Sequence, residues 1–311
     1  MTERKITIGT DQEFFLRKKS TNELISAIPY IKGGKHDPIV LPCGSNLQSD
    51  NVAVEFAILP ATTHEDFVDK IRTTFSETIK SLPEGTDLSV VPSANFNPKE
   101  LEDPKAAEFG CSPDYCAWDI IINESPCIDD PNFRSCGGHV HVGGIDADGE
   151  PLHKDVAFLT DPTGMGPIMM VRGMDTFHGI ISTIFDHSEA SIERRKLYGK
   201  AGCHRPTPYG VEYRALSNWW TKTPYSSMLI SSLTDDVVEV IAAGKLDGII
   251  KQISEKTIRG VINEGDAERA RHIVDEVLMD YMSENSKFYF EECSKKLESS
   301  GDVVKEWSIE V

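Results

Sequence analysis

Residues 137–144 read GGHVHVGG, an alternation of histidine and valine that is typical of a β-strand. Side chains two residues apart leave a strand on the same face, so we expect His139 and His141 side by side on a strand over Cys136–Ile145. Two neighbouring imidazoles can bind zinc or contact a phosphate chain, and the glycines at both ends allow a ligand to approach the backbone. Two ordinary core histidines are the alternative interpretation.

Carboxylates recur with the same alternation on three other expected strands. Asp11 and Glu13 are two residues apart, and Glu55 stands among apolar residues, where a buried carboxylate is costly unless paired or bound to a metal. Glu212 precedes Arg214 by two residues. Each carboxylate alone is compatible with a solvated strand face or a sheet edge. Because hard cations prefer such oxygen ligands, the combination indicates a site for cations and a polyphosphate on the strands Ile6–Leu16, Val52–Ile58 and Gly210–Leu216.

Four arginines lie close together in the sequence around the segment Tyr198–Gly202. They are Arg194, Arg195, Arg205 and Arg214. Several guanidinium groups beside carboxylates suggest neutralisation of phosphate or recognition of a substrate carboxylate. Surface charge at a helix end is the alternative for one of Arg194 and Arg195.

The composition limits the classes of partner. The 50 acidic and 32 basic residues give a formal charge of -18, which disfavours unassisted binding to nucleic acid or to an anionic membrane. The seven cysteines form no CxxC pair, which excludes a zinc ribbon and favours reduced thiols in the cytoplasm. No apolar run approaches the roughly 18 residues that a membrane span needs.

Several motifs with a known mechanism are missing from the sequence. It contains no GxxxxGK[ST] phosphate loop, no GxGxxG after a strand, no HExxH and no GxSxG. Any ATP would therefore bind by a route other than a phosphate loop.

The remaining sequence predicts a sheet followed by helices within one domain of residues 1–311. Thr63 is expected to cap a helix over His64–Leu82, with Asp66 as its capping-box partner. The long irregular stretch Ser93–Arg134 contains Phe109, Trp118 and an apolar run at 120–122, which argue for ordered structure. Residues 1–223 would form the catalytic sheet and its helices, and 224–311 a helical buttress. Other expected elements are a hairpin strand at Glu23–Ile28, a strand at Asp87–Pro92, helical structure over 151–198, and helices at Ser226–Ala243, Leu246–Lys256 and Asp266–Met282.

Six stretches, in one order between residues 6 and 220, resemble the phage-associated COOH·NH2 ligases, or type-2 amidoligases. This family belongs to the glutamine synthetase-like superfamily of carboxylate–amine ligases. The co-linear order of the stretches is more specific than any one of them. They read GTDQEFF, DNVAVEFAILPA, FGCSPDYCAW, GGHVHVGG, RRKLYGKAG and GVEYRALSNWW.

The resemblance implies an α+β fold with a curved antiparallel sheet, whose concave face holds ATP and Mg2+ or Mn2+, and with helices packed outside. It also implies an enzyme in which ATP phosphorylates a carboxylate and an amine then displaces phosphate to form an amide. The carboxylate and amine would belong to small molecules or peptides. A homo-oligomer and a cytoplasmic location, in a host cell if the gene is carried by a phage, are further expectations.

Roles follow from the resemblance residue by residue. Asp11, Glu13, Glu55, His139 and Glu212 would ligate metal, and His139, His141, Arg205 and Arg214 would contact the nucleotide. Arg214, Arg195 and Glu212 would be catalytic, with Arg214 neutralising charge on the transferring phosphoryl group. The first acidic pair is Asp-x-Glu rather than the Glu-x-Glu of the superfamily, so direct ligation by Asp11 is an open question.

Two other functions compete with the ligase. A zinc hydrolase would use His139, His141 and a carboxylate to activate water. A binding protein without catalysis would retain the fold alone. The ligase accounts best for the residues, because phosphoryl transfer depends on metals and arginine rather than on a protein nucleophile.

Overall fold

An antiparallel sheet of eleven strands forms the centre of the computed structural model, which describes residues 4–107, 114–124, 130–296 and 302–310. β2 (Leu24–Ile25) and β6 (Thr86–Ser89) pair with the second half of β1, beside the main path of the sheet. Along that path the strands are β3 (Ile39–Val40), β4 (Asn46–Asp50), β5 (Ala53–Ala57), β1 (Thr7–Lys18), β11 (Gly138–Gly143), β13 (Gly210–Tyr213), β12 (Cys203–Thr207), β8 (Tyr115–Cys116) and β9 (Ile121–Ile122).

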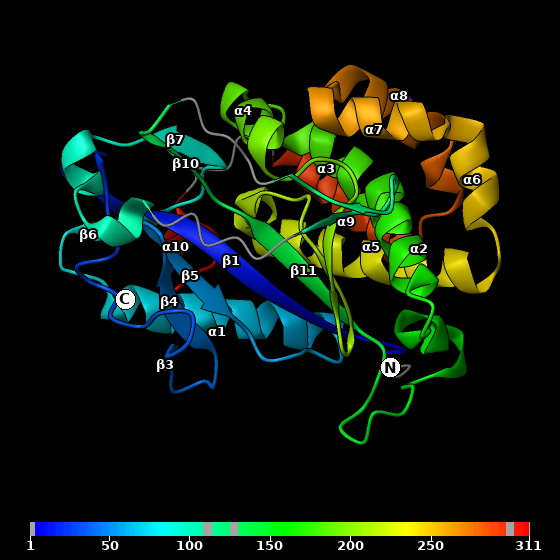
Figure 1. Ribbon diagram of the computed structural model, residues 1–311, viewed down its shortest axis with the longest axis horizontal. Coiled ribbons are helices and arrows are strands. Elements are labelled where there is room, and N and C mark those ends of the chain that lie inside the picture. Colours follow the sequence, from blue (N-terminus) through cyan, green and yellow to red (C-terminus); the bar gives the residue numbers. More distant parts are fainter. Residues whose placement is uncertain (1–3, 108–113, 125–129, 297–301, 311) are drawn as a thin grey trace.

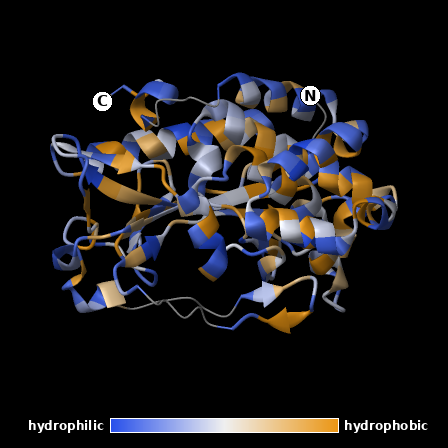
Figure 2. Ribbon diagram, turned by 90° about the horizontal axis from the view of Figure 1, so that it is seen from above, coloured by the Kyte–Doolittle hydropathy of each residue, from blue (hydrophilic) through white to orange (hydrophobic). Residues whose placement is uncertain are grey.

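Helices pack outside this sheet, and the α+β class expected from the sequence is confirmed (Figure 1). Figure 2 shows that most helices carry both hydrophilic and hydrophobic residues, as expected of helices with one buried face. The helices are α1 (His64–Ser81), α2 (Met165–Met174), α3 (Ile180–Phe185), α4 (Glu189–Leu197), α5 (Pro224–Ala242), α6 (Leu246–Ile253), α7 (Glu255–Glu264), α8 (Ala267–Glu276), α9 (Glu284–Lys295) and α10 (Val303–Glu306).

The alternation of β1 separates an apolar face from a polar one. Phe14 is fully buried and stacks on Phe56 of β5, with ring centroids 5.4 Å apart. Phe75 of α1 packs against both rings, at 5.1 Å from each. Asp11 and Glu13 occupy the opposite face and are only partly buried. The aromatic core therefore determines which face of the sheet carries the charged groups.

At the start of α1, one predicted capping contact is present and the other is different. The Thr63 side chain accepts a hydrogen bond from the backbone N–H of Asp66 at 3.0 Å, as expected of an N-cap. The Asp66 carboxylate, however, accepts from the N–H of Thr62 at 3.2 Å rather than from that of Thr63. The expected capping box is therefore wrong in its second half, because Asp66 reaches one residue further back.

The irregular stretch before β11 holds several short elements. They are two 3-10 turns, Pro98–Leu101 and Pro104–Ala107, and the paired strands β7 (Ser93–Asn95) and β10 (Phe133–Ser135). Trp118 is buried, whereas the apolar run at 120–122, which includes β9, is more than half exposed and does not contribute to the core. Phe109 lies outside the described residues.

Several elements were not predicted individually, among them β4, β12 and α7. The first two are short and polar, and the third ends at Gly265 within a region expected to be helical. No helix in the described part of the chain is long and apolar enough to cross a membrane.

We expect Thr63→Ala to lower the free energy of unfolding by about 1 kcal/mol, because the first turn of α1 loses the acceptor for the N–H of Asp66. Urea denaturation followed by circular dichroism measures the change. Thr62→Ala is the matched control, since Thr62 is exposed and contributes only its backbone to the cap. Equal losses in the two variants would contradict the assignment of Thr63 as N-cap.

Candidate active site

The register of the sheet brings the predicted site residues of separate strands together. Glu13 on β1 lies directly opposite Glu55 on β5. Asp11 lies opposite His139 on β11. Side chains paired in this way point to the same face. The same rule places His141 opposite Glu212, and Glu212 opposite Arg205 on β12.

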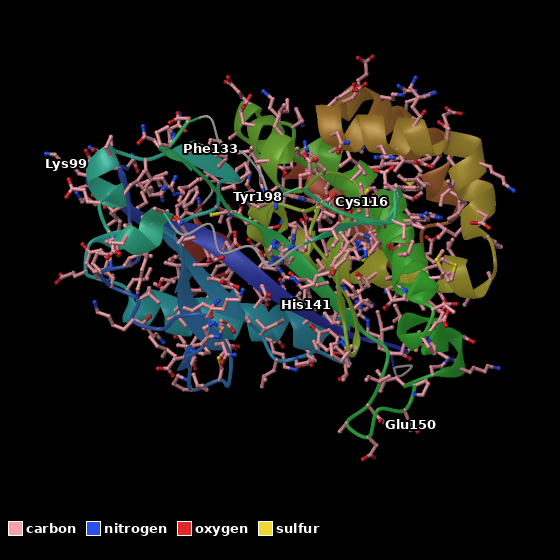
Figure 3. The ribbon with its side chains drawn as sticks, in the orientation of Figure 1. Lys99, Cys116, Phe133, His141, Glu150 and Tyr198 are labelled. Atoms are coloured by element: carbon pink, nitrogen blue, oxygen red, sulfur yellow. The ribbon has the colours of Figure 1, made fainter. Side chains whose placement is uncertain are left out.

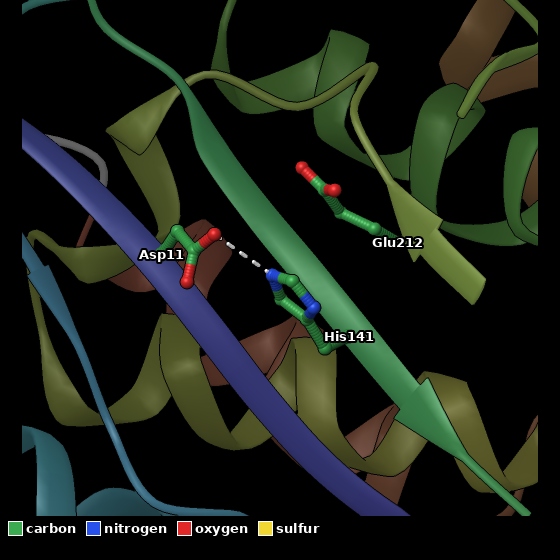
Figure 4. Close-up of side chains that lie close together, drawn as sticks. All are labelled: Asp11, His141 and Glu212. Atoms are coloured by element: carbon green, nitrogen blue, oxygen red, sulfur yellow. Dashed lines mark ion pairs between the residues drawn. The ribbon is translucent and has the colours of Figure 1, made fainter. Parts of the chain in front are cut away.

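Three of these side chains form a group that can hold a cation (Figure 4). Asp11, His141 and Glu212 each offer one ligand atom, and these atoms lie within 4.8 Å of one another. His141 Nε2 is 3.0 Å from Asp11 Oδ2, where a proton on that nitrogen would pair with the carboxylate. Two carboxylates and one imidazole fit Mg2+ or Mn2+ in the chemistry of their donor atoms.

Glu212 is held by two arginines. Its side chain is 2% exposed, and its carboxylate accepts from Arg205 Nη1 at 2.9 Å and from Arg214 Nη1. Arg214 Nη1 also lies 3.4 Å from Nδ1 of His139. A buried carboxylate requires such partners because desolvation of an unpaired charge is costly. Arg214, two residues beyond Glu212, therefore points to the site face as expected.

The two histidines of β11 have opposite shifts in pKa. Burial, together with the nearby Arg214 and Arg194, lowers the pKa of His139 well below its ordinary value. Burial acts in the same direction on His141, but the carboxylate of Asp11 outweighs it and raises the pKa of His141. The surroundings of His139 therefore favour its neutral form, whereas Asp11 favours the charged form of His141.

A second group of carboxylates lies toward β4 and β5. Burial and the charge of Asp50 raise the pKa of Glu13 to about 7, although the N–H of Gly137 donates to it at 2.5 Å. Burial and the neighbouring carboxylates raise the pKa of Glu55 well above its ordinary value, and Gln48 Nε2 donates to it at 2.6 Å. Like charges that share a buried space disfavour ionisation, and a bound cation would reverse the effect.

Arg195 is the predicted site residue that the structure does not bring to this face. Its Nη2 donates to the backbone oxygen of Asp186 at 2.6 Å, behind the site. Arg194 lines the cavity instead, with Nη1 and Nη2 donating to the carbonyl oxygens of Ala215 and Leu216 at 3.1 and 2.9 Å. Neither arginine is surface charge, because their exposed fractions are 2% for Arg194 and 5% for Arg195.

The glycines around the double-histidine strand are required by the protein's own atoms. A Cβ at Gly137 would lie 2.4 Å from Nε2 of His139, and one at Gly138 would lie 2.3 Å from the backbone oxygen of Ser217. At the other end, a Cβ at Gly143 would lie 2.4 Å from a threonine hydroxyl on β1. These contacts give the glycines a packing role that was not expected, and Gly137 also lines the site cavity.

The site face borders a cavity of about 270 Å3. Phe133 of β10 and Tyr198 at the end of α4, both labelled in Figure 3, line it. Gln48 and Asp50 also line the cavity and were not predicted as site residues, although they alternate on β4 as Asp11 and Glu13 do on β1. Further lining residues that were not predicted are Lys35, Asn51, Asp114, Arg134 and Ser135.

A buried network supports β13 from behind. Tyr213 follows Glu212 and points to the opposite face, where its hydroxyl donates to Asp175 at 2.7 Å. Nε1 of Trp118 donates to the other carboxylate oxygen at 2.6 Å. Burial raises the pKa of Asp175 to about 7 despite these two donors. β13 is therefore fixed on its rear face by hydrogen bonds that do not involve the site.

Comparison with known families supports the resemblance seen in the sequence. Residues 165–307 match the family described as Phage phiEco32-like COOH.NH2 ligase-type 2, which confirms the resemblance to COOH·NH2 ligases. The matched range includes Arg194, Arg205, Glu212 and Arg214. The site residues of β1, β5 and β11 precede it. No curated protein matches the chain.

Solved structures with a similar course of the chain are distant in sequence. A bifunctional glutathione synthetase from Pasteurella multocida is 9% identical over 96% of this chain, with a TM-score of 0.43, and this chain spans 53% of its length. A structure described as a novel glutamine synthase homolog is 12% identical over 92% of this chain and 70% of its own, with a TM-score of 0.41.

The raised pKa of Asp175 predicts a pH dependence of stability. The folded chain binds one more proton than the unfolded chain between the ordinary carboxyl value of 3.8 and about 7, so this group makes the free energy of unfolding fall as pH rises through that window. The asparagine side chain of the Asp175→Asn variant cannot ionise, so the variant should lack this pH-dependent contribution to the free energy of unfolding. Urea denaturation at pH 5 and pH 8 should show the variant gaining stability relative to the wild type at pH 8. The same difference in free energy of unfolding between variant and wild type at both pH values would contradict the raised pKa of Asp175.

Proposed function

We propose that this chain is an ATP-dependent carboxylate–amine ligase that forms an amide through an acyl phosphate, with Mg2+ or Mn2+ at the site. The observation that carries the proposal is the convergence of Asp11, His141 and Glu212 on one sheet face, with Arg205 and Arg214 on the same carboxylate. A cation group beside two guanidiniums suits a polyphosphate better than it suits an uncharged substrate.

In the proposed reaction a carboxylate oxygen of the acid attacks the γ-phosphorus, and the bond to ADP breaks. The amine nitrogen then attacks the acyl carbon, phosphate leaves, and the nitrogen loses a proton. Mg2+ held by the acidic groups would neutralise phosphate charge and align the transferred group. No protein nucleophile is needed for either step.

The chain's own residues would contribute position and charge. Glu212 holds Arg205 and Arg214 in place by ion pairs. Both guanidiniums would neutralise the negative charge that develops on the transferring group. Arg194, fixed by two carbonyl oxygens, adds positive charge near Glu13. Such preorganised groups lower the barrier because they need no rearrangement during the reaction.

The zinc hydrolase is less well supported. It requires His139 and His141 to hold one ion together, whereas the group found among the described residues contains His141 without His139. His139 lies 3.4 Å from both Glu212 and Arg214, and a guanidinium beside it disfavours a metal at that nitrogen. A non-catalytic binding protein would not require charged groups to be buried at this cost.

The carboxylate and the amine would come from small molecules or peptides, and the acidic chain would work in the cytoplasm without nucleic acid. The cavity, at about 270 Å3, is small, and both cationic and anionic side chains line it. ADP release measured across a panel of amino acids and amines, with the product mass determined, would identify the pair.

We expect ATP binding to depend on a divalent cation, since the carboxylates around Glu13 would otherwise repel the phosphates. Calorimetry with ATP should show affinity in Mg2+ or Mn2+ and at least a tenfold loss in EDTA. Glu212→Gln should lose the same affinity, because it removes an anionic ligand with little change in volume. Nucleotide affinity that is unchanged by EDTA would overturn the proposal.

Arg214→Ala should lower kcat by about 10²–10³-fold with little change in the KM for ATP, as expected of a group that acts mainly in the transition state. Arg214→Lys should recover only part of this, because a point charge does not reproduce the planar fork. Steady-state kinetics with the identified substrates measures both. A rise in KM alone would instead make Arg214 a ground-state binding residue, and thermal unfolding of each variant controls for misfolding.

A further inference from the structure

Tyr209 touches the cation group from the turn between β12 and β13. Its hydroxyl lies 2.6 Å from Nδ1 of His141, and the two ring centroids are 6.1 Å apart. The turn is fixed by its backbone, since the carbonyl oxygen of Tyr209 accepts from the N–H of Gly144 at 2.8 Å. Gly210, which follows Tyr209, pairs with Gly143 across the strands. The hydroxyl therefore faces His141 because of the local fold.

The two nitrogens of His141 have different neighbours. Nδ1 faces Tyr209, whereas Nε2 faces Asp11 at 3.0 Å and belongs to the group of possible cation ligands. A neutral imidazole carries its proton on one nitrogen and a lone pair on the other. Nε2 can bind a cation only if the proton is on Nδ1, and Nδ1 then needs an acceptor.

We propose that Tyr209 is a positioning residue that accepts a hydrogen bond from Nδ1–H of His141 and so keeps the Nε2 lone pair directed at Asp11 and Glu212. This inference rests on the proposed function for its purpose, but not for the tautomer itself. Nothing in the sequence pattern singled out Tyr209, because it lies in a turn rather than on a strand.

In the opposite arrangement Tyr209 donates to Nδ1, and Nε2–H points at the Asp11 carboxylate 3.0 Å away. That arrangement leaves no lone pair on Nε2 for a cation, whereas a cation between Nε2 and Asp11 requires the proton on Nδ1. Tyr209 is also 38% exposed, so water can accept its own hydroxyl proton while its oxygen accepts from Nδ1–H.

The first measurement is made on metal-free protein. Imidazole 15N chemical shifts at a pH above the titration of His141 report which nitrogen carries the proton, and the His141→Ala spectrum assigns the signal. We expect the Nδ1–H tautomer in the wild type and a loss of that preference in Tyr209→Phe, which removes only the hydroxyl. Nε2–H in the wild type, or unchanged shifts in the variant, would overturn the proposal whatever the chain catalyses.

The second measurement is Mn2+ affinity by calorimetry. Tyr209→Phe should bind Mn2+ about 10- to 100-fold more weakly, the usual effect of losing a hydrogen bond behind a metal ligand. Tyr30→Phe is the matched control, since Tyr30 is 46% exposed and lies in another loop. In the His141→Ala background, Tyr209→Phe should add nothing further, because Tyr209 acts through His141.

The outcomes separate the two proposals. Equal Mn2+ affinity in the wild type and Tyr209→Phe would overturn the role of Tyr209 and leave the ligase intact. An additive loss in the double variant would show that Tyr209 acts on the fold rather than through His141, and would also overturn it. No Mn2+ binding by the wild type would count against the ligase, while the tautomer measurement still decides the role of Tyr209.

Discussion

The antiparallel register of β5, β1, β11, β13 and β12 is the constraint on which the site depends. It sets Glu55 against Glu13, Asp11 against His139, and His141 against Glu212. A slip of one residue in any strand would turn its charged side chains into the aromatic core and its apolar side chains into the cavity. The packing of Phe14 on the rear face therefore stabilises the geometry of the front face.

That geometry has an electrostatic cost within the fold. Glu13, Glu55 and Asp50 all have a raised pKa, while Asp11 has a lowered one because His141 and two arginines outweigh its desolvation. Groups with shifts of opposite sign on one sheet face are typical of functional sites rather than of surfaces optimised for stability. The guanidinium groups of Arg205 and Arg214 offset the negative charge of Glu212. The carboxylates nearer to β4 retain an excess of negative charge.

The sequence predicted those site residues whose direction follows from strand alternation alone. Asp11, His139 and Glu212 needed no knowledge of their neighbours, because each lies on a strand with a period of two. Arg194 and Arg195 could not be separated, since the choice depends on how α4 is rotated against β13. Tyr209 was not predicted because a turn has no comparable period, and β4 was overlooked because Leu47 is its only apolar residue. The glycines of GGHVHVGG were expected to admit a ligand, and their packing role was not predicted because contacts such as those with Ser217 and Thr7 come from distant segments.

β13 shows how one short strand joins the two faces. Glu212 points to the cation group, and Tyr213 points to the buried carboxyl of Asp175, so adjacent residues bind opposite sides of the sheet. The π-helical turn Asp175–Gly179 aims that carboxyl at the strand, and Trp118 holds it from the β8–β9 hairpin. A shift of β13 that relaxed the ion pairs of Glu212 would break a fully buried hydrogen bond on the other face. The rigidity of the charged face therefore arises from neutral contacts behind it, which allows like charges to stay close together without opening the sheet.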